Sequence, residues 1–333
     1  MRRIVDGKVF LLLIYVDDIL ILADEAELKR IQEVFVREFT WITFDVNNQH
    51  SYLGMQVSLE KGSATIDMTN FVQTLIDDCV NLWEYTSPAA KNAFLVNPEA
   101  ESLSETDRRL FHTIVAKLLY LSKRARPDIL TIVSFLCTRV TKATKEDAAK
   151  LSRVLGYLQK TKGENLQLRP KGVLQVEAYV DASFAPHTDS KSHTGVTVFI
   201  GGAMVFAASR KQKCVTKSPT ESELVGLTDN ISFIELFEEF FRFITNTEKR
   251  SATIYQDSTS VISLVTKGGG VVRTKHLRVR MNLCKEAVDE GRLKILYVHT
   301  SKMIADGLTK TLEGKAFTTF QKNMLKVQEK QTV

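Results

Sequence analysis

Tyr179-Val180-Asp181-Ala182-Ser183 ends an apolar run that begins at residue 173, and it places a carboxylate where a buried strand would leave its sheet. Residues 194–200 and 203–208 form two more runs of this kind, with Gly201-Gly202 between them. Runs of β-branched and apolar residues separated by turn residues are typical of antiparallel strands. The sequence therefore predicts a three-stranded meander with Asp181 at the exit of its first strand.

Helical and strand patterns alternate after the meander. The helices are expected at residues 220–245, 258–267, 274–290 and 302–312, and the strands at 252–255 and 293–298. This order predicts an α/β domain with mixed strand directions. Because residues 163–172 are polar and contain a proline, they are the expected boundary. The predicted domain covers residues 173–315, and 316–333 form a tail.

Three more carboxylates have comparable positions in this domain. Glu223 lies in the first turn of a helix, Asp257 ends the fourth strand, and Asp306 lies on the last helix. Phosphodiester hydrolysis by two divalent ions needs several carboxylates, because Mg²⁺ prefers hard oxygen ligands. Strand ends and helix faces can converge on one point, so these acids could cut a nucleic-acid backbone. The alternative is a set of helix caps and exposed turn residues.

The N-terminal third has a different pattern. Residues 9–16 and 19–23 are apolar and flank Asp17 and Asp18, which predicts a hairpin with the acids at its tip. A helix over 25–39 and a second strand pair follow within residues 1–85, and residues 86–165 form a helical connection. The helices of this connection are broken at Pro127 and near Lys142.

The composition is that of an ordinary globular protein with a basic surface. The 333 residues are 44% hydrophobic and 25% charged, with a net charge of +6, which suits a polyanionic partner. The four cysteines form no Cys-x-x-Cys pair, so a reducing, intracellular setting is expected. No apolar run approaches the roughly 20 residues that span a bilayer, so no membrane partner is expected.

The C-terminal half resembles a ribonuclease H domain, and the whole chain resembles the end of the Pol polyprotein of copia-type LTR retrotransposons. The order and spacing of the shared motifs follow that family from about residue 8 to residue 312. Besides the four acids, the resemblance depends on Arg126-Pro127-Asp128-Ile129, Ser218-Pro219-Thr220-Glu221-Ser222-Glu223, Arg273-Thr274-Lys275-His276 and Ala305-Asp306-Gly307-Leu308-Thr309-Lys310.

The resemblance implies a mixed α/β fold. A five-stranded mixed sheet of the ribonuclease H type is expected with its helices, preceded in the chain by a truncated reverse-transcriptase palm and thumb and by the helical connection. It also implies an endonuclease that degrades the RNA strand of RNA:DNA hybrids. Two Mg²⁺ ions, or Mn²⁺ in their place, would be held by the four acids: Asp181, Glu223, Asp257 and Asp306.

Two further assignments depend on the same resemblance. Glu223 is preferred to Glu221 because the run Leu224-Val225-Gly226-Leu227 after it matches that of the family's catalytic glutamate, and Glu221 is the second choice. His299 resembles a mobile histidine that helps the product leave in some ribonucleases H.

Tyr15-Val16-Asp17-Asp18 matches the palm hairpin of reverse transcriptases, in which the acidic pair helps to bind metals. Polymerisation also needs an upstream aspartate that would precede Met1, so the polymerase is expected only as an inactive fragment. The implied partners are the hybrid and the upstream polymerase and integrase portions of the polyprotein. The element's life cycle implies cytoplasmic particles and then the nucleus.

A basic stretch lies between the meander and the helix of Glu223. It could contact hybrid phosphates, or it could be a solvated strand end. The residues concerned are Arg210, Lys211, Lys213 and Lys217. An alternative function is that of a catalytically silent remnant, or a domesticated protein, that binds nucleic acid through this surface.

Overall fold

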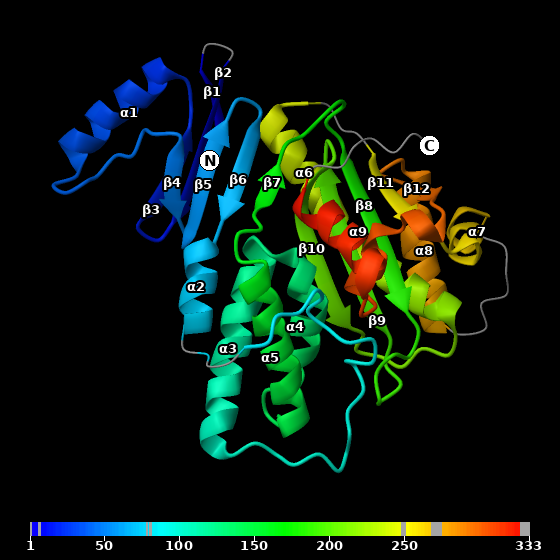
Figure 1. Cartoon of the computed structure of the whole chain (residues 1–333). Helices are drawn as coiled ribbons and strands as arrows, with labels where there is room; N and C mark the ends of the chain where they lie inside the picture. The colour runs from blue at the N-terminus through cyan, green and yellow to red at the C-terminus, as the bar shows by residue number, and fades with distance from the viewer. Residues whose placement is uncertain are drawn as a thin grey trace.

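The computed structural model describes residues 2–5, 8–77, 79, 82–247, 251–267 and 275–326 (Figure 1). Arg273 and Thr274, the first half of one quoted motif, lie outside these ranges. Three sheets and the helices packed on them make up the described part. None of the described helices is both long and apolar enough to cross a lipid bilayer.

The largest sheet has five strands in the order β10-β9-β8-β11-β12. These are β8 (Val176–Ser183), β9 (His193–Ile200), β10 (Ala203–Lys211), β11 (Ala252–Gln256) and β12 (Leu293–Tyr297). Neighbours are antiparallel from β10 to β8 and parallel from β8 to β12. The predicted mixed α/β fold with its five-stranded mixed sheet is therefore confirmed. Gly201 and Gly202 form the turn of the meander at positive φ, 57° and 79°, which glycine adopts without strain.

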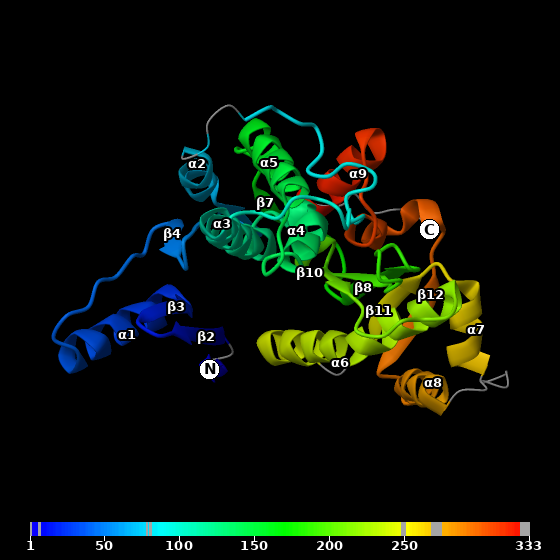
Figure 2. The same cartoon turned by 90° about the horizontal axis from the view of Figure 1, so that it is seen from below.

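One face of this sheet is covered by α6 (Pro219–Thr245), which packs against β8 and β9. Helices α7 (Thr259–Lys267) and α8 (Lys275–Asp289) lie beside it (Figure 2). The buried core between sheet and helix contains alternate residues of β8, Val176, Ala178 and Val180. Since successive side chains of a strand point to opposite faces, Asp181 points to the other face.

That other face is approached by two 3-10 helices, η2 (Thr300–Lys302) and η3 (Ile304–Leu308), and then by α9 (Gly314–Leu325). The single helix predicted over residues 302–312 is therefore wrong. A Cβ at Gly307 would lie 2.2 Å from the Phe320 ring, so α9 packs directly on the backbone of η3. This tertiary contact fixes the chain in short turns where the local pattern favoured a continuous helix.

The N-terminal part forms two sheets. The first contains β1 (Arg2–Val5), β2 (Lys8–Tyr15) and β3 (Asp18–Leu22), and α1 (Glu25–Glu38) follows it. The second contains β4 (Gln49–Tyr52), β5 (Met55–Glu60), β6 (Ser63–Asp67) and β7 (Leu166–Leu168), with α2 (Thr69–Asp77) after β6. Strand β7 lies inside the expected boundary segment and pairs with β6, so the chain returns to this sheet after the helical connection.

The helical connection contains α3 (Glu105–Arg124), η1 (Pro127–Ile129), α4 (Leu130–Cys137) and α5 (Lys145–Lys160). Its breaks fall at Pro127 and just before Thr144, which caps α5 through a reciprocal hydrogen bond with Asp147. The buried core of these helices continues into the five-stranded sheet, η3 and α9, where it includes Phe199, Met204, Leu308 and Phe320. The domain boundaries stay predictions, because one core is shared across them.

A buried ion pair joins η1 to α5. Arg126 donates to both carboxylate oxygens of Asp128, at 3.0 and 2.8 Å, and to the carbonyl of Thr161 at 2.9 Å. The hydroxyl of Tyr157 donates to Asp128 at 2.5 Å. Because Arg126 is only 1% exposed, each of these partners offsets the cost of removing its charge from water.

We expect Asp128→Asn to lower the free energy of unfolding by about 3–5 kcal/mol, because it leaves the Arg126 charge buried without its counter-ion. Urea denaturation followed by circular dichroism measures this loss. Tyr157→Phe is the matched control, because it removes one hydroxyl bonded to the carboxylate and should cost less, about 1.5–3 kcal/mol. A smaller loss for Asp128→Asn than for Tyr157→Phe would contradict the importance given to the ion pair.

Candidate active site

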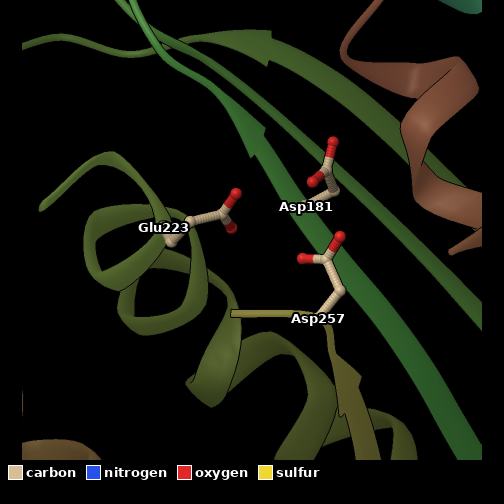
Figure 3. A group of neighbouring side chains, drawn as sticks. All are labelled: Asp181, Glu223 and Asp257. Atoms are coloured by element: carbon tan, nitrogen blue, oxygen red, sulfur yellow. The ribbon is translucent and has the colours of Figure 1, made fainter. Parts of the chain in front are cut away.

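Three carboxylates meet at one end of the five-stranded sheet. Asp181, Glu223 and Asp257 each offer an oxygen, and these oxygens all lie within 4.8 Å of one another. Figure 3 shows the three side chains pointing toward a common space from β8, α6 and the residue after β11. Hard oxygen ligands at this spacing are what Mg²⁺ or Mn²⁺ needs from a protein.

The strand directions bring the two aspartates together. Strands β8 and β11 are parallel neighbours, and Tyr179 pairs with Tyr255 in their register. Asp181 and Asp257 each lie two residues after this pair, so both reach the same end of the sheet.

Glu223 comes from the beginning of α6, and Gly226 lets this helix approach the sheet closely. A Cβ at Gly226 would lie 3.2 Å from Thr194 and 3.4 Å from Ala182. A larger residue there would move the first turns of α6, and Glu223 with them, away from β8.

Each carboxylate also receives a hydrogen bond from a neutral side chain. Thr309 donates through its hydroxyl to Oδ2 of Asp181, and Thr300 donates to Oδ2 of Asp257 at 2.9 Å. The Nε2 of Gln256 donates to Oε2 of Glu223 at 3.3 Å. These bonds hold the orientation of the three acids.

Gln256 has a second role in the same turn. Its Oε1 accepts hydrogen bonds from the backbone N–H groups of Asp257 and Ser258, at 2.8 and 3.1 Å. The side chain is fully buried, and it therefore fixes Asp257 relative to Glu223. Sequence reasoning missed Gln256, and its only signal was an amide at the end of an otherwise apolar strand.

Burial and mutual repulsion make negative charge costly in this cluster. Burial, together with the charges of Asp181 and Asp257, raises the pKa of Glu223 to about 9. Burial also raises the pKa of Asp181 to about 6, although the Lys310 ammonium and the Thr309 hydrogen bond act in the opposite direction. A bound divalent cation would relieve this repulsion, so the donor set fits a metal ion.

Asp306 is near these three acids but is not one of the group within 4.8 Å. It lies on η3, and its Oδ1 accepts a hydrogen bond from Lys310 at 2.6 Å. The same Lys310 ammonium lies 4.0 Å from Oδ2 of Asp181. Asp306 is thus joined to the cluster through a cation of the protein itself, and its role as a metal ligand stays a prediction.

Gly195 lets η3 come close to the cluster. It is the register partner of Asp181 on β9, and a Cβ there would lie 2.6 Å from Leu308 and 2.9 Å from the carbonyl of Ala305. The backbone of η3, which carries Asp306, therefore packs directly against β9 at Gly195, where no side chain intervenes.

The other predicted acids and the histidine are not members of the group of three clustered carboxylates. Glu221 accepts a hydrogen bond from the backbone of Lys217 at 2.9 Å, at the start of α6. His299 is exposed and its Nδ1 lies 2.8 Å from the hydroxyl of Ser301. Asp17 and Asp18 are exposed at the turn between β2 and β3, in a different sheet.

The basic stretch includes the last two residues of β10, Arg210 and Lys211, and continues toward α6. Arg210, Lys213 and Lys217 are exposed, so their charges are open to a partner. Lys211 is less available, because its ammonium lies 2.7 Å from Asp189. Their part in binding nucleic acid stays a prediction.

No protein-family model matches this chain. It is 26% identical over 326 residues to the retrovirus-related Pol polyprotein from transposon TNT 1-94 of Nicotiana tabacum, which covers 95% of the chain and 24% of that protein. It is 28% identical over 313 residues to the corresponding polyprotein from transposon RE1 of Arabidopsis thaliana, covering 93% of the chain and 21% of that protein. The chain thus spans less than a quarter of the length of these relatives.

Among solved structures, the foamy viral protease-reverse transcriptase in complex with an RNA/DNA hybrid aligns with 87% of this chain and 36% of its own. The TM-score of that alignment is 0.46 and the sequence identity is 12%.

Glu223→Gln should raise the thermal midpoint measured in EDTA by at least about 2 °C, because a neutral amide avoids the cost of either ionising Glu223 in the cluster or keeping it protonated there. The pKa of Glu223 is raised from 4.5 to about 9 in the folded state, so between these values the folded protein keeps a proton that the unfolded chain has released. Wild-type stability in EDTA should therefore fall as the pH rises through this range, and it should fall less in the variant.

Differential scanning calorimetry from pH 5 to pH 9 tests this expectation. Glu221→Gln makes the same chemical change two residues earlier and should leave the pH dependence of the midpoint as in wild type. If the midpoint depended on pH in the same way in wild type and in Glu223→Gln, the pKa of Glu223 would not be raised by folding.

Gly195→Ala should destabilise the protein by about 1–3 kcal/mol, because the new methyl group would overlap Leu308 and the backbone of Ala305. Gly163→Ala is the control, since a Cβ at Gly163 would meet no atom within 4 Å. Urea denaturation of both variants measures the difference. Equal stability of the two variants would mean that η3 does not pack on β9 as described.

Proposed function

Since this chain is a homologue of the Pol polyproteins of copia-type retrotransposons, we propose that its C-terminal half is a metal-dependent endonuclease. In this proposal it hydrolyses the RNA strand of RNA:DNA hybrids. The observation that supports it most directly is the convergence of Asp181, Glu223 and Asp257, which come from three different elements. Homology alone would not require these acids to meet in this chain.

The proposed ligands are Asp181, Glu223, Asp257 and Asp306, and the proposed ion is Mg²⁺, with Mn²⁺ as a substitute. Two such ions would supply an activated water and stabilise the charge on the attacking and leaving oxygens. The protein's own contribution is to hold the carboxylates in place. Thr309, Thr300 and Gln256 each hold one acid through a neutral hydrogen bond, which restricts its rotation without cancelling its charge.

The proposed substrate is bound along the basic stretch. Arg210, at the end of β10, is exposed, as are Lys213 and Lys217 between β10 and α6, the helix that carries Glu223. Phosphate contacts from such residues position a nucleic acid without reading its sequence. We therefore assign hybrid binding to these three residues, with a smaller part for Lys211. His299 is proposed to help release the product.

For the N-terminal part we propose an origin in the palm of a reverse transcriptase. Asp17 and Asp18 lie at the turn of an antiparallel hairpin, as they do in that motif. The partners proposed for this part are the polymerase and integrase portions of a longer polyprotein. Cytoplasmic particles and the nucleus are the proposed compartments.

Incubation of the purified protein with Mg²⁺ and a hybrid labelled on its RNA strand tests the nuclease. Wild type should cut the RNA strand, and EDTA should stop the reaction. Asp257→Asn should reduce the rate at least about 100-fold, because it removes a charged ligand while keeping the shape of the side chain. Glu221→Gln, which lies outside the cluster, should retain most of the activity.

Duplex DNA and single-stranded RNA of the same sequence serve as substrate controls. Binding of the hybrid without cleavage at any Mg²⁺ or Mn²⁺ concentration would reject the nuclease and favour a silent nucleic-acid-binding protein. Equal cutting of single-stranded RNA would reject the specificity for hybrids.

A further inference from the structure

Lys310 brings a positive charge to the acidic cluster from within the chain. Its ammonium lies 2.6 Å from Oδ1 of Asp306 and 4.0 Å from Oδ2 of Asp181. Burial lowers the pKa of Lys310, but the charges of Asp181 and Asp306 reverse this effect and raise it, so the ammonium stays charged. It is the nearest cation to Asp181 among the ion pairs of the described residues.

The position of this ammonium explains why Asp306 stands apart from the other three acids. Asp181, Glu223 and Asp257 offer oxygens within 4.8 Å of one another, whereas the carboxylate of Asp306 is bonded to Lys310. The lysine therefore takes a place between Asp181 and Asp306 that a metal ion shared by these two acids would need.

We propose that Lys310 is a built-in counter-cation, which neutralises the Asp181 and Asp306 side of the cluster and leaves it when a divalent ion binds there. The inference rests on the proposed function, because it assumes that the four acids hold metal. The three clustered acids would then accept a first ion without rearrangement. Binding of a second ion, between Asp181 and Asp306, would require Lys310 to withdraw.

The side chain of Lys310 is suited to such a movement. It is 45% exposed, so the ammonium can reach solvent by rotation of its flexible stem. Asp181 is not left without support when the lysine withdraws, because the buried hydroxyl of Thr309 still donates to it. Lys310 therefore differs from the neutral donors around the cluster, which have no charge to compete with a metal ion.

The simpler alternative is an ordinary helical-type ion pair between residues four apart. Asp306 and Lys310 have that spacing, and such pairs on a surface contribute little to stability. That alternative predicts at most a small, salt-screened change in metal affinity when the charge of the lysine is removed. A metal titration therefore separates the two explanations without any measurement of nuclease activity.

The experiment compares wild type with Lys310→Met, Lys310→Arg and Lys61→Met. Lys310→Met removes the charge and keeps most of the stem, while Lys310→Arg keeps the charge. Lys61→Met is the matched control, because Lys61 is exposed at the turn between β5 and β6, in another sheet. Mn²⁺ affinity is measured by calorimetric titration, and the thermal midpoint is followed over the same Mn²⁺ concentrations.

The expected result is Mn²⁺ binding about tenfold tighter in Lys310→Met than in wild type, together with a lower midpoint in EDTA. Lys310→Arg and Lys61→Met should both bind as wild type does. If Lys310→Met does not fold, Lys310→Gln gives the same comparison.

Unchanged or weaker Mn²⁺ binding in the neutral variants, with clear binding by wild type, would overturn the inference and leave the proposed function intact. If neither wild type nor the variants bind Mn²⁺, both the inference and the metal dependence of the proposed function are overturned. Binding by Lys310→Met alone would support the counter-cation and show that it is the main obstacle to metal binding.

Discussion

Mutual repulsion among buried carboxylates is the constraint on which the arrangement around the candidate active site depends. Three acids from three elements are brought within 4.8 Å of one another, and burial raises the pKa values of two of them, Asp181 and Glu223. Such a cluster is unfavourable for folding unless something else in the chain holds it together. The parallel pairing of β8 with β11 and the close packing of α6 at Gly226 supply that support.

The groups around the cluster are of two kinds: neutral donors that orient the acids, and a cation that offsets their charge. Two threonine hydroxyls and the amide of Gln256 orient the acids and leave their charges in place. Lys310 acts on the other side, where it offsets charge at Asp181 and Asp306. In the proposed function, the acids held together in this way would attract a divalent cation.

Much of the fold could be predicted from the sequence, because the elements of the five-stranded sheet have clear local patterns. The strand exits at Asp181 and Asp257 followed from apolar runs and turn residues. By contrast, β7 is only three residues long and is stabilised by pairing with β6, about 100 residues earlier, so no local pattern could reveal it. The short turns around Asp306 depend in the same way on Phe320, which packs on Gly307 from a later helix.

The site itself could be predicted only in part. Strand periodicity located the two aspartates. Glu221 and Glu223 have the same side chain and lie in the same turn, so the preference for Glu223 depended on the family resemblance, and of these two the structure brings only Glu223 into the group of three acids. Gln256, Thr300 and Thr309 were not predicted, because amides and hydroxyls occur throughout such a sequence. Each of them matters because it lies within hydrogen-bond distance of an acid in the folded chain. No regular spacing in the sequence reveals that contact.

One hydrogen bond connects the helical connection to the loop of Asp306. The hydroxyl of Thr131, on α4, donates to the carbonyl of Gly307 at 2.6 Å, one residue after Asp306. Since both groups are buried, α4 cannot shift without straining this backbone or leaving a polar group unsatisfied. Asp306 is thus mechanically coupled to a segment some 170 residues earlier in the chain, and a displacement of those helices would be transmitted to the position of its carboxylate.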